Sequence, residues 1–285
     1  MIVANPPFVV SPESQFLFRD SPLPADELSS MIVTEAADHL ADGGFAHILC
    51  NWALTEGEEW PGPPRRWLAG TQCDALILHF GTEDPVAYAA MWNAPLRSGD
   101  PSAFVSAVDR WLDYYRLRGI HALCSGAVVL RRRASSDHHW VRPFSLRHLP
   151  EDPAGEDLLR LFRGQDWLEA RGSDELLLDS VLQLLDRHEV RQTLTYRGGV
   201  YDSHGCTIVR TSGLGLEVAV DPEALQVVLR LDGRQTVREV ARQVAAELGL
   251  DAPALLDKAA MAARELLGHG LILPGEGVDA SSPSA

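Results

Sequence analysis

The stretch Met1-Ile2-Val3-Ala4-Asn5-Pro6-Pro7-Phe8 opens the chain and decides how the rest of the sequence is interpreted. Ile2 to Ala4 form a short apolar run that is typical of a buried strand. Asn5-Pro6-Pro7 ends this run, because proline has no backbone N–H to donate to a sheet. A domain seldom begins inside a buried strand, so we expect either a gene whose start lies upstream of Met1 or a relic that does not work alone.

Apolar segments that alternate between strand and helix patterns follow. They predict an α/β sheet covered by helices on both faces, over residues 1–133. The expected helices are 25–40, a short one within 60–70, 85–92 and 103–118; the expected strands after the first are 45–50, 73–80 and 120–132.

A second region is predicted after a linker at 134–153, where Ser, His, Pro and charged residues accumulate. It covers 154–274 and is followed by a disordered tail at 275–285. Its expected elements are helices at 158–162, 174–187, 223–231, 237–248 and 254–268, strands at 206–211 and 216–220, and a terminal apolar run at 271–273.

Composition limits the classes of function. The 285 residues are 46% hydrophobic and carry a net charge of −15, with 12 basic and 17 acidic residues in 1–150 against 13 and 23 in 151–285. Phosphate neutralisation supplies most non-specific affinity for nucleic acid, so this acidity makes an extended nucleic-acid footprint unfavourable.

The four cysteines are widely spaced, which indicates reduced thiols rather than disulfides. No signal peptide or membrane-spanning run is found, so we expect a cytoplasmic protein that does not bind a membrane.

Asn5, Pro6, Pro7 and Phe8 suit chemistry on a planar nitrogen. The nitrogen of an exocyclic amine or a side-chain amide is a poor nucleophile, because its lone pair is delocalised. The Asn5 side-chain carbonyl and the Pro6 backbone carbonyl could each accept one of its N–H groups and stabilise the positive charge that develops on it. Two prolines stiffen the loop, and Phe8 could stack on the acceptor. The alternative is a strand-terminating turn with an ordinary core Phe.

This motif resembles that of class I S-adenosylmethionine-dependent methyltransferases that modify amino groups. The chain as a whole resembles large actinobacterial-type members with an N-terminal region, a central methyltransferase small domain and a C-terminal domain of unknown role. The central domain is similar to release-factor glutamine and ribosomal-RNA guanine methyltransferases. The segments that carry this wider resemblance are Phe16-Leu17-Phe18-Arg19-Asp20, Leu40-Ala41-Asp42-Gly43-Gly44, Asn51-Trp52 and Trp67-Leu68-Ala69-Gly70-Thr71.

The resemblance implies the C-terminal half of a Rossmann-like sheet, with Met1 at its fourth strand and Asn5, Pro6, Pro7 and Phe8 as catalytic residues. It also implies S-adenosylmethionine as the methyl donor, held by a Gly-rich loop that would precede Met1. Gly213-Leu214-Gly215 leads into an alternating strand and is therefore predicted to be a hairpin turn. We expect the isolated chain to bind the donor weakly, and to aggregate or need a partner because Ile2–Ala4 would be an exposed edge.

Other candidate residues have competing interpretations. Asn51 and Trp52 follow a strand at the edge where open sheets bind ligands, so they could line the substrate pocket; a structural role is favoured for Trp52. His138-His139 beside Arg131-Arg132-Arg133 could suggest a metal or phosphate site, but a solvated linker is favoured and no metal is expected.

The C-terminal region is similar to winged-helix modules, with Leu231–Val237 followed by two predicted helices. Its last helix offers Lys258 and Arg264 against Asp257 and Glu265, which favours a protein partner over DNA. The methyl acceptor could be a protein amide, an RNA base or a small-molecule amine, and the acidity favours the first and last. The rival hypothesis is a non-catalytic protein-binding module that retains a methyltransferase scaffold.

Overall fold

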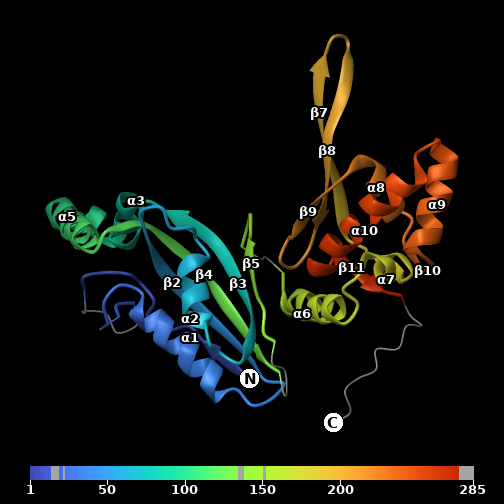
Figure 1. Ribbon diagram of the computed structural model, residues 1–285. Helices are drawn as coiled ribbons and strands as arrows, with labels where there is room; N and C mark the ends of the chain where they lie inside the picture. The colour runs from blue at the N-terminus through green and yellow to red at the C-terminus, as the bar shows by residue number, and fades with distance from the viewer. Residues whose placement is uncertain (14–18, 22, 134–137, 150–151, 276–285) are drawn as a thin grey trace. The chain divides into compact units, whose positions relative to one another are not determined.

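The computed structural model describes residues 1–13, 19–21, 23–133, 138–149 and 152–275. The chain divides into two compact units, Met1–Arg147 (unit 1) and His148–Ala285 (unit 2). Figure 1 shows both, and each is described by itself below. The segment Phe16–Phe18 and the tail 276–285 lie outside the described residues.

Unit 1 is a mixed sheet flanked by helices. Its elements are β1 (Ile2–Ala4), α1 (Glu27–His39), β2 (Phe45–Thr55), α2 (Gly62–Leu68), β3 (Cys73–Glu83), α3 (Pro85–Trp92), α4 (Ala94–Gly99), α5 (Pro101–Arg118), β4 (Ile120–Arg132) and β5 (Val141–Ser145). The predicted helices and strands of residues 1–133 are confirmed, with bounds that shift by a few residues.

The five strands of unit 1 lie in the order β1-β2-β4-β3-β5. β1 runs parallel to β2, β4 runs antiparallel to both β2 and β3, and β5 runs parallel to β3. Alternate residues of the strands face opposite sides of the sheet. Buried side chains of α1 and α2 pack with one face, and buried side chains of α3 and α5 pack against part of β4 on the other.

Strand β5 is a correction to the expected linker at 134–153. Val141 to Ser145 pair with Ala75 to His79 of β3, and Phe144 is buried. Five residues with one proline are a weak strand signal on their own, but the free edge of β3 supplies the hydrogen-bonding partner. The division between the units therefore falls after Arg147.

Unit 2 contains two three-stranded sheets and five helices among its described residues. Its elements are α6 (Gly155–Ala170), α7 (Asp174–Leu178), β6 (Val181–Leu184), β7 (His188–Arg197), β8 (Val200–Arg210), β9 (Glu217–Val220), α8 (Pro222–Val228), β10 (Asp232–Thr236), α9 (Val237–Leu248), α10 (Ala252–Gly268) and β11 (Ile272–Pro274). One sheet has the order β10-β6-β11 and the other β7-β8-β9.

The prediction of one helix over 174–187 is wrong. Helix α7 ends at Leu178, and β6 follows as the central strand between β10 and β11. The leucine-rich run is compatible with either structure, because its apolar residues at 176–178, 181–182 and 184–185 fit no single period. Sheet pairing on both sides of β6 decides the outcome, since a short apolar run has no preferred period of its own.

Strand β7 was not predicted. It forms a long hairpin with β8 through Gly198 and Gly199, which have φ of 57° and 96°. Two consecutive residues with positive φ are typical of a type I′ hairpin turn, which glycine adopts without strain. The hairpin extends beyond the helices of unit 2 (Figure 1). None of the helices in the described ranges is long and apolar enough to cross a membrane.

Candidate functional site

The Asn5-Pro6-Pro7-Phe8 motif leaves β1 at the edge of the sheet in unit 1. Ala4 pairs with Ile48 of β2, and the chain then leaves the sheet at Asn5. Asn5 is exposed, and its side chain makes no hydrogen bond within the described part of the chain. Pro6 and Pro7 are half-buried, and Phe8 packs against the cluster between the sheet and helices α3 and α5. The amide of Asn5 is therefore available to a ligand, while Phe8 anchors the motif.

Two buried tyrosines fix the backbone just after the motif. The Tyr88 hydroxyl oxygen accepts the Val10 N–H at 3.3 Å and an Asn51 amide N–H at 2.6 Å. The Tyr115 hydroxyl donates to the Val10 carbonyl at 2.8 Å. Both backbone groups of Val10 are thus satisfied by side chains from α3 and α5. Burial raises the pKa of Tyr88 to about 12, so its hydroxyl stays protonated at neutral pH.

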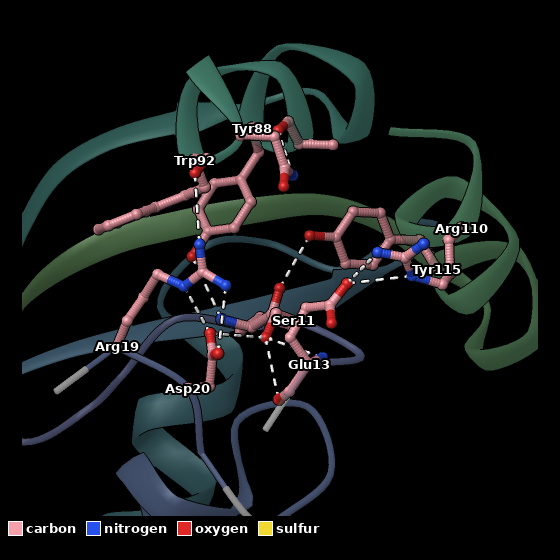
Figure 2. A network of polar contacts seen from close by, with 11 residues as sticks. Ser11, Glu13, Arg19, Asp20, Tyr88, Trp92, Arg110 and Tyr115 are labelled. Carbon is pink, nitrogen blue, oxygen red and sulfur yellow. Dashed lines mark hydrogen bonds and ion pairs between the residues drawn. The ribbon is translucent and has the colours of Figure 1, made fainter. Parts of the chain in front are cut away.

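A second set of contacts holds Arg19 and Asp20, where the chain comes back alongside Val9. The Val9 N–H donates to the Arg19 carbonyl at 3.2 Å, and the buried Asp20 carboxylate accepts from Arg19 Nε at 2.6 Å and from Ser11 Oγ at 3.3 Å. Figure 2 shows this group beside Tyr88 and Tyr115. Hydrogen bonds to an ionised carboxylate are stronger than those between neutral groups. Removing the partners of a buried carboxylate would leave an unpaired charge, which costs several kcal/mol. The loop therefore has a defined conformation on either side of residues 14–18.

A surface ion pair adds to this network. Arg110 of α5 donates from Nε and Nη2 to Glu13 Oε1, at 3.0 and 2.5 Å (Figure 2). Because Arg110 is more than half exposed, the pair contributes little to stability. The pair also fastens the loop to α5 at a second point, beside the contact of Tyr115.

Asn51 and Trp52 do not share a site. They are neighbours on β2 and point to opposite faces of the sheet, as adjacent strand residues must. Asn51 is buried toward Tyr88, whereas Trp52 is buried in the cluster of α1 and α2 and donates from Nε1 to the Trp60 carbonyl at 2.7 Å. Asn51 supports the loop that follows the motif, and Trp52 belongs to the core on the far side.

Asp26 is a further titratable group near the carboxyl end of β2. It lies just before α1 and accepts the Ala53 N–H at 3.3 Å. Desolvation by burial raises the pKa of this carboxyl group. Sequence analysis did not single out Asp26, Tyr88 or Tyr115, because each acts through contacts with residues far away in the sequence.

Gly213-Leu214-Gly215 is a hairpin turn, as predicted, and it joins β8 to the antiparallel β9. The Leu214 N–H donates to Asp157 Oδ2 of α6 at 2.8 Å, and Asp157 also pairs with Arg160. Gly213 has a φ of 63°, and a Cβ at this position would overlap the Asp157 carboxylate. The turn is therefore packed against α6 at Gly213 and Leu214.

Arg131, Arg133 and His139, near the end of β4, surround a buried carboxylate. Asp74 of β3 has no exposed side-chain surface and pairs with Arg131 Nη2 at 2.7 Å and Arg133 Nε at 3.1 Å. His139 Nδ1 lies 3.6 Å from the same carboxylate. The favoured interpretation as a solvated linker is wrong for Arg131, Arg133 and His139, because Asp74 holds them against the start of β3, whereas His138 is exposed. Within the described ranges, no group of three or more His, Cys, Asp or Glu is placed to hold a metal ion.

Comparison with known proteins bears on unit 2 alone. Residues 160–274 match DUF7782, a domain of unknown function. No curated protein matches the chain. The matched range runs from within α6 to the end of β11, so the second unit is similar to a recurring domain that carries no assigned activity.

Proposed function

We propose that unit 1 is the acceptor side of an S-adenosylmethionine-dependent N-methyltransferase that acts on a planar amino or amide nitrogen. The observation that carries this proposal is the Asn5-Pro6-Pro7-Phe8 motif on an edge strand, with the Asn5 amide exposed and the following backbone fixed. A catalytic acceptor must be both free and positioned, because a preorganised group loses little entropy in the transition state.

In this proposal Asn5 and the Pro6 carbonyl accept the two N–H groups of the target nitrogen. Tyr88, Tyr115 and Asp20 act through the loop and not on the substrate. The donor, S-adenosylmethionine, is bound by a Gly-rich loop that is not among the described residues. The unpaired side of β1, where Val3 is 71% exposed, is the place at which further strands of a Rossmann-like sheet would add.

Three classes of methyl acceptor fit this chemistry: a protein amide, an RNA base and a small-molecule amine. The net charge of −15 favours a protein or a small molecule. Unit 2, which we propose to be winged-helix-like, supports the same preference. Both basic side chains of α10 are paired internally, Lys258 with Asp221 and Glu223, and Arg264 with Asp174. These carboxylates offset the positive charge that α10 could present to a phosphate backbone.

The test uses the protein expressed with any in-frame sequence that precedes the Met1 codon in the gene. It is incubated with labelled S-adenosylmethionine and, separately, with protein, RNA and small-molecule fractions of its host. We expect label in one fraction, loss of transfer in Asn5→Ala, and partial transfer in Asn5→Asp, which keeps a side-chain acceptor. Unchanged transfer in Asn5→Ala contradicts the assigned role of Asn5.

The proposal also predicts how residues 1–285 alone bind the methyl donor. We expect isothermal titration of this chain with S-adenosylmethionine to show no saturable binding in the micromolar range. Tight binding would show that the chain itself holds the donor, and it would contradict the proposal that these residues form only the acceptor side.

A non-catalytic protein-binding module is the second candidate, favoured by the exposed apolar side chains of the β7–β8 hairpin. The sequence of the gene upstream of Met1 discriminates the two. An in-frame strand followed by a Gly-rich loop supports the methyltransferase, and a stop codon directly upstream supports the binding module.

A further inference from the structure

Strand β7 is an open sheet edge. It is ten residues long and forms one side of the sheet β7-β8-β9, so the backbone groups on its outer side have no strand partner among the described residues. Edge strands are commonly protected from other chains by charged side chains, by proline or by a bulge. β7 contains no proline, the extra residue of its irregular register lies in β8, and its charged residues Glu189, Arg191 and Arg197 all lie on one face.

One face of the hairpin is apolar beyond the part that the core covers. Near the base, Val190 and Gln192 lie opposite Ile208 and Cys206, which belong to the core of unit 2. Further out, the same face carries Leu194, Tyr196 and Tyr201, which are 51%, 62% and 69% exposed. Tyr196 and Tyr201 are a cross-strand pair with ring centroids 5.2 Å apart. An apolar face that continues past its own core indicates a surface that another chain covers.

The other face of β7 is polar and carries Glu189, Arg191 and Arg197, of which Arg191 lies 3.4 Å from Glu189 in an exposed ion pair. Glu189 and Arg197 lie near the two ends of the strand, and Thr193 lies midway between them. All three residues are exposed and share a face, since they are separated by even numbers of residues. If this strand pairs antiparallel with a copy of itself about Thr193, Glu189 of each chain lies opposite Arg197 of the other. In the same register Val190 of each chain lies opposite Tyr196.

We propose that β7 pairs antiparallel with β7 of a second copy of this chain, with Thr193 opposite Thr193 at a twofold axis. The two three-stranded sheets β7-β8-β9 then form one six-stranded sheet with an isologous interface. Antiparallel pairing places the apolar tip of each hairpin beside the base of the other, where the partner's core begins. The interface contains two Glu189–Arg197 ion pairs and two Val190–Tyr196 contacts, all in directly opposite positions. This inference does not depend on the proposed methyl transfer.

Charge reversal tests the ion pairs. Sedimentation velocity of the full chain across a dilution series is expected to show a monomer–dimer equilibrium. Glu189→Arg and Arg197→Glu each place two pairs of like charges opposite one another, and each is expected to raise the dissociation constant roughly tenfold. The double variant Glu189→Arg with Arg197→Glu restores opposite charges and is expected to restore the wild-type constant. Arg234→Glu, on β10, makes the same change of charge outside the hairpin and is expected to leave the equilibrium unchanged.

Cross-linking tests the register. In Thr193→Cys the two new thiols lie directly opposite each other, within the distance a disulfide spans, and an intermolecular disulfide is expected under mild oxidation. In Thr195→Cys the new thiols are displaced by four residues along the strands, which is too far for a disulfide. The four native cysteines are buried, so the background is low. A chain that is monomeric at every concentration, a dimer that neither charge reversal weakens, or equal cross-linking of the two cysteine variants would overturn the proposal.

Discussion

Each unit contains one loop that is fastened by side chains from distant elements, and the two loops differ in what they leave free. In unit 2 the turn at Gly213 to Gly215 is closed by the ionic acceptor Asp157, and Leu214 is buried. In unit 1 the backbone around Val10 is held by neutral tyrosine hydroxyls, and the nearby Asn5 amide is exposed. A loop that is fixed and has no free polar group serves the fold. A loop that is fixed and presents a free amide has what a binding or catalytic site requires.

Removing Asp157 is expected to have the largest effect. Asp157→Ala leaves the Leu214 N–H without its acceptor and leaves the side chains of Arg160 and Arg210 near an empty, largely buried position. We expect a loss of about 3 kcal/mol from the stability of unit 2. Hydrogen exchange of the full chain followed by mass spectrometry assigns the loss to a unit.

Asp157→Asn is the matched control for this prediction. It keeps an acceptor for the Leu214 N–H and removes only the charge, so we expect a smaller loss than in Asp157→Ala. Equal losses in the two variants would mean that the ion pairs, and not the turn, account for the role of Asp157.

Alkaline pH should act on unit 1 through its tyrosine anchor. Burial raises the pKa of Tyr88 from 10.0 to about 12, so the folded chain keeps this proton at a pH where the unfolded chain has released it. The stabilisation is complete below the unfolded pKa of about 10 and is lost as pH rises toward 12, by about 2–3 kcal/mol in total. Tyr88→Phe should reduce this dependence. Tyrosinate absorbance and unfolding across this pH range measure it, and identical profiles for the two chains would contradict it.

The fold was largely predictable from the sequence where a segment has one strong period. The segment 237–248 is predicted and found as α9, and 120–132 as β4, because their apolar spacing matches one kind of element. The apolar residues of the run 174–187 fit no single period, so only its pairing with β10 and β11 decides that part of it is a strand. For β7, the pair Gly198-Gly199 between β-branched and aromatic residues is a hairpin signal in the sequence itself.

The motif of the candidate site was predictable from the sequence, but the residues that hold the following backbone in place were not. Asn5 to Phe8 are adjacent in sequence, so their chemistry could be interpreted from spacing alone. Tyr88 and Tyr115 contact Val10 across 78 and 105 residues, and nothing local marks either tyrosine as its partner. The opposite orientations of Asn51 and Trp52 follow from strand geometry, and could have excluded a shared pocket at the start.

A smaller loss of stability is expected when Tyr115, one of the two tyrosines that hold the loop of unit 1, loses its hydroxyl. Tyr115→Phe removes the hydroxyl that donates to the Val10 carbonyl and should cost about 1 kcal/mol. Tyr196→Phe in unit 2 is the matched control, since Tyr196 is 62% exposed and its loss should be within about 0.5 kcal/mol. Urea unfolding of the full chain compares them, and equal stabilities would show that the Tyr115 hydroxyl does not hold the loop.

The smallest effect on stability is expected at Asn5, and this is what separates it from Asn51. Asn5 is exposed without a hydrogen bond in the described part of the chain, so Asn5→Ala should change stability by less than about 0.5 kcal/mol. Asn51 is buried and donates to Tyr88, so Asn51→Ala should cost about 1–2 kcal/mol, because it also leaves a small cavity beside the anchor. Thermal unfolding of the two variants measures both. A large loss in Asn5→Ala would mean that the motif is a structural turn, and the chemical role proposed for it would then have no free group to rest on.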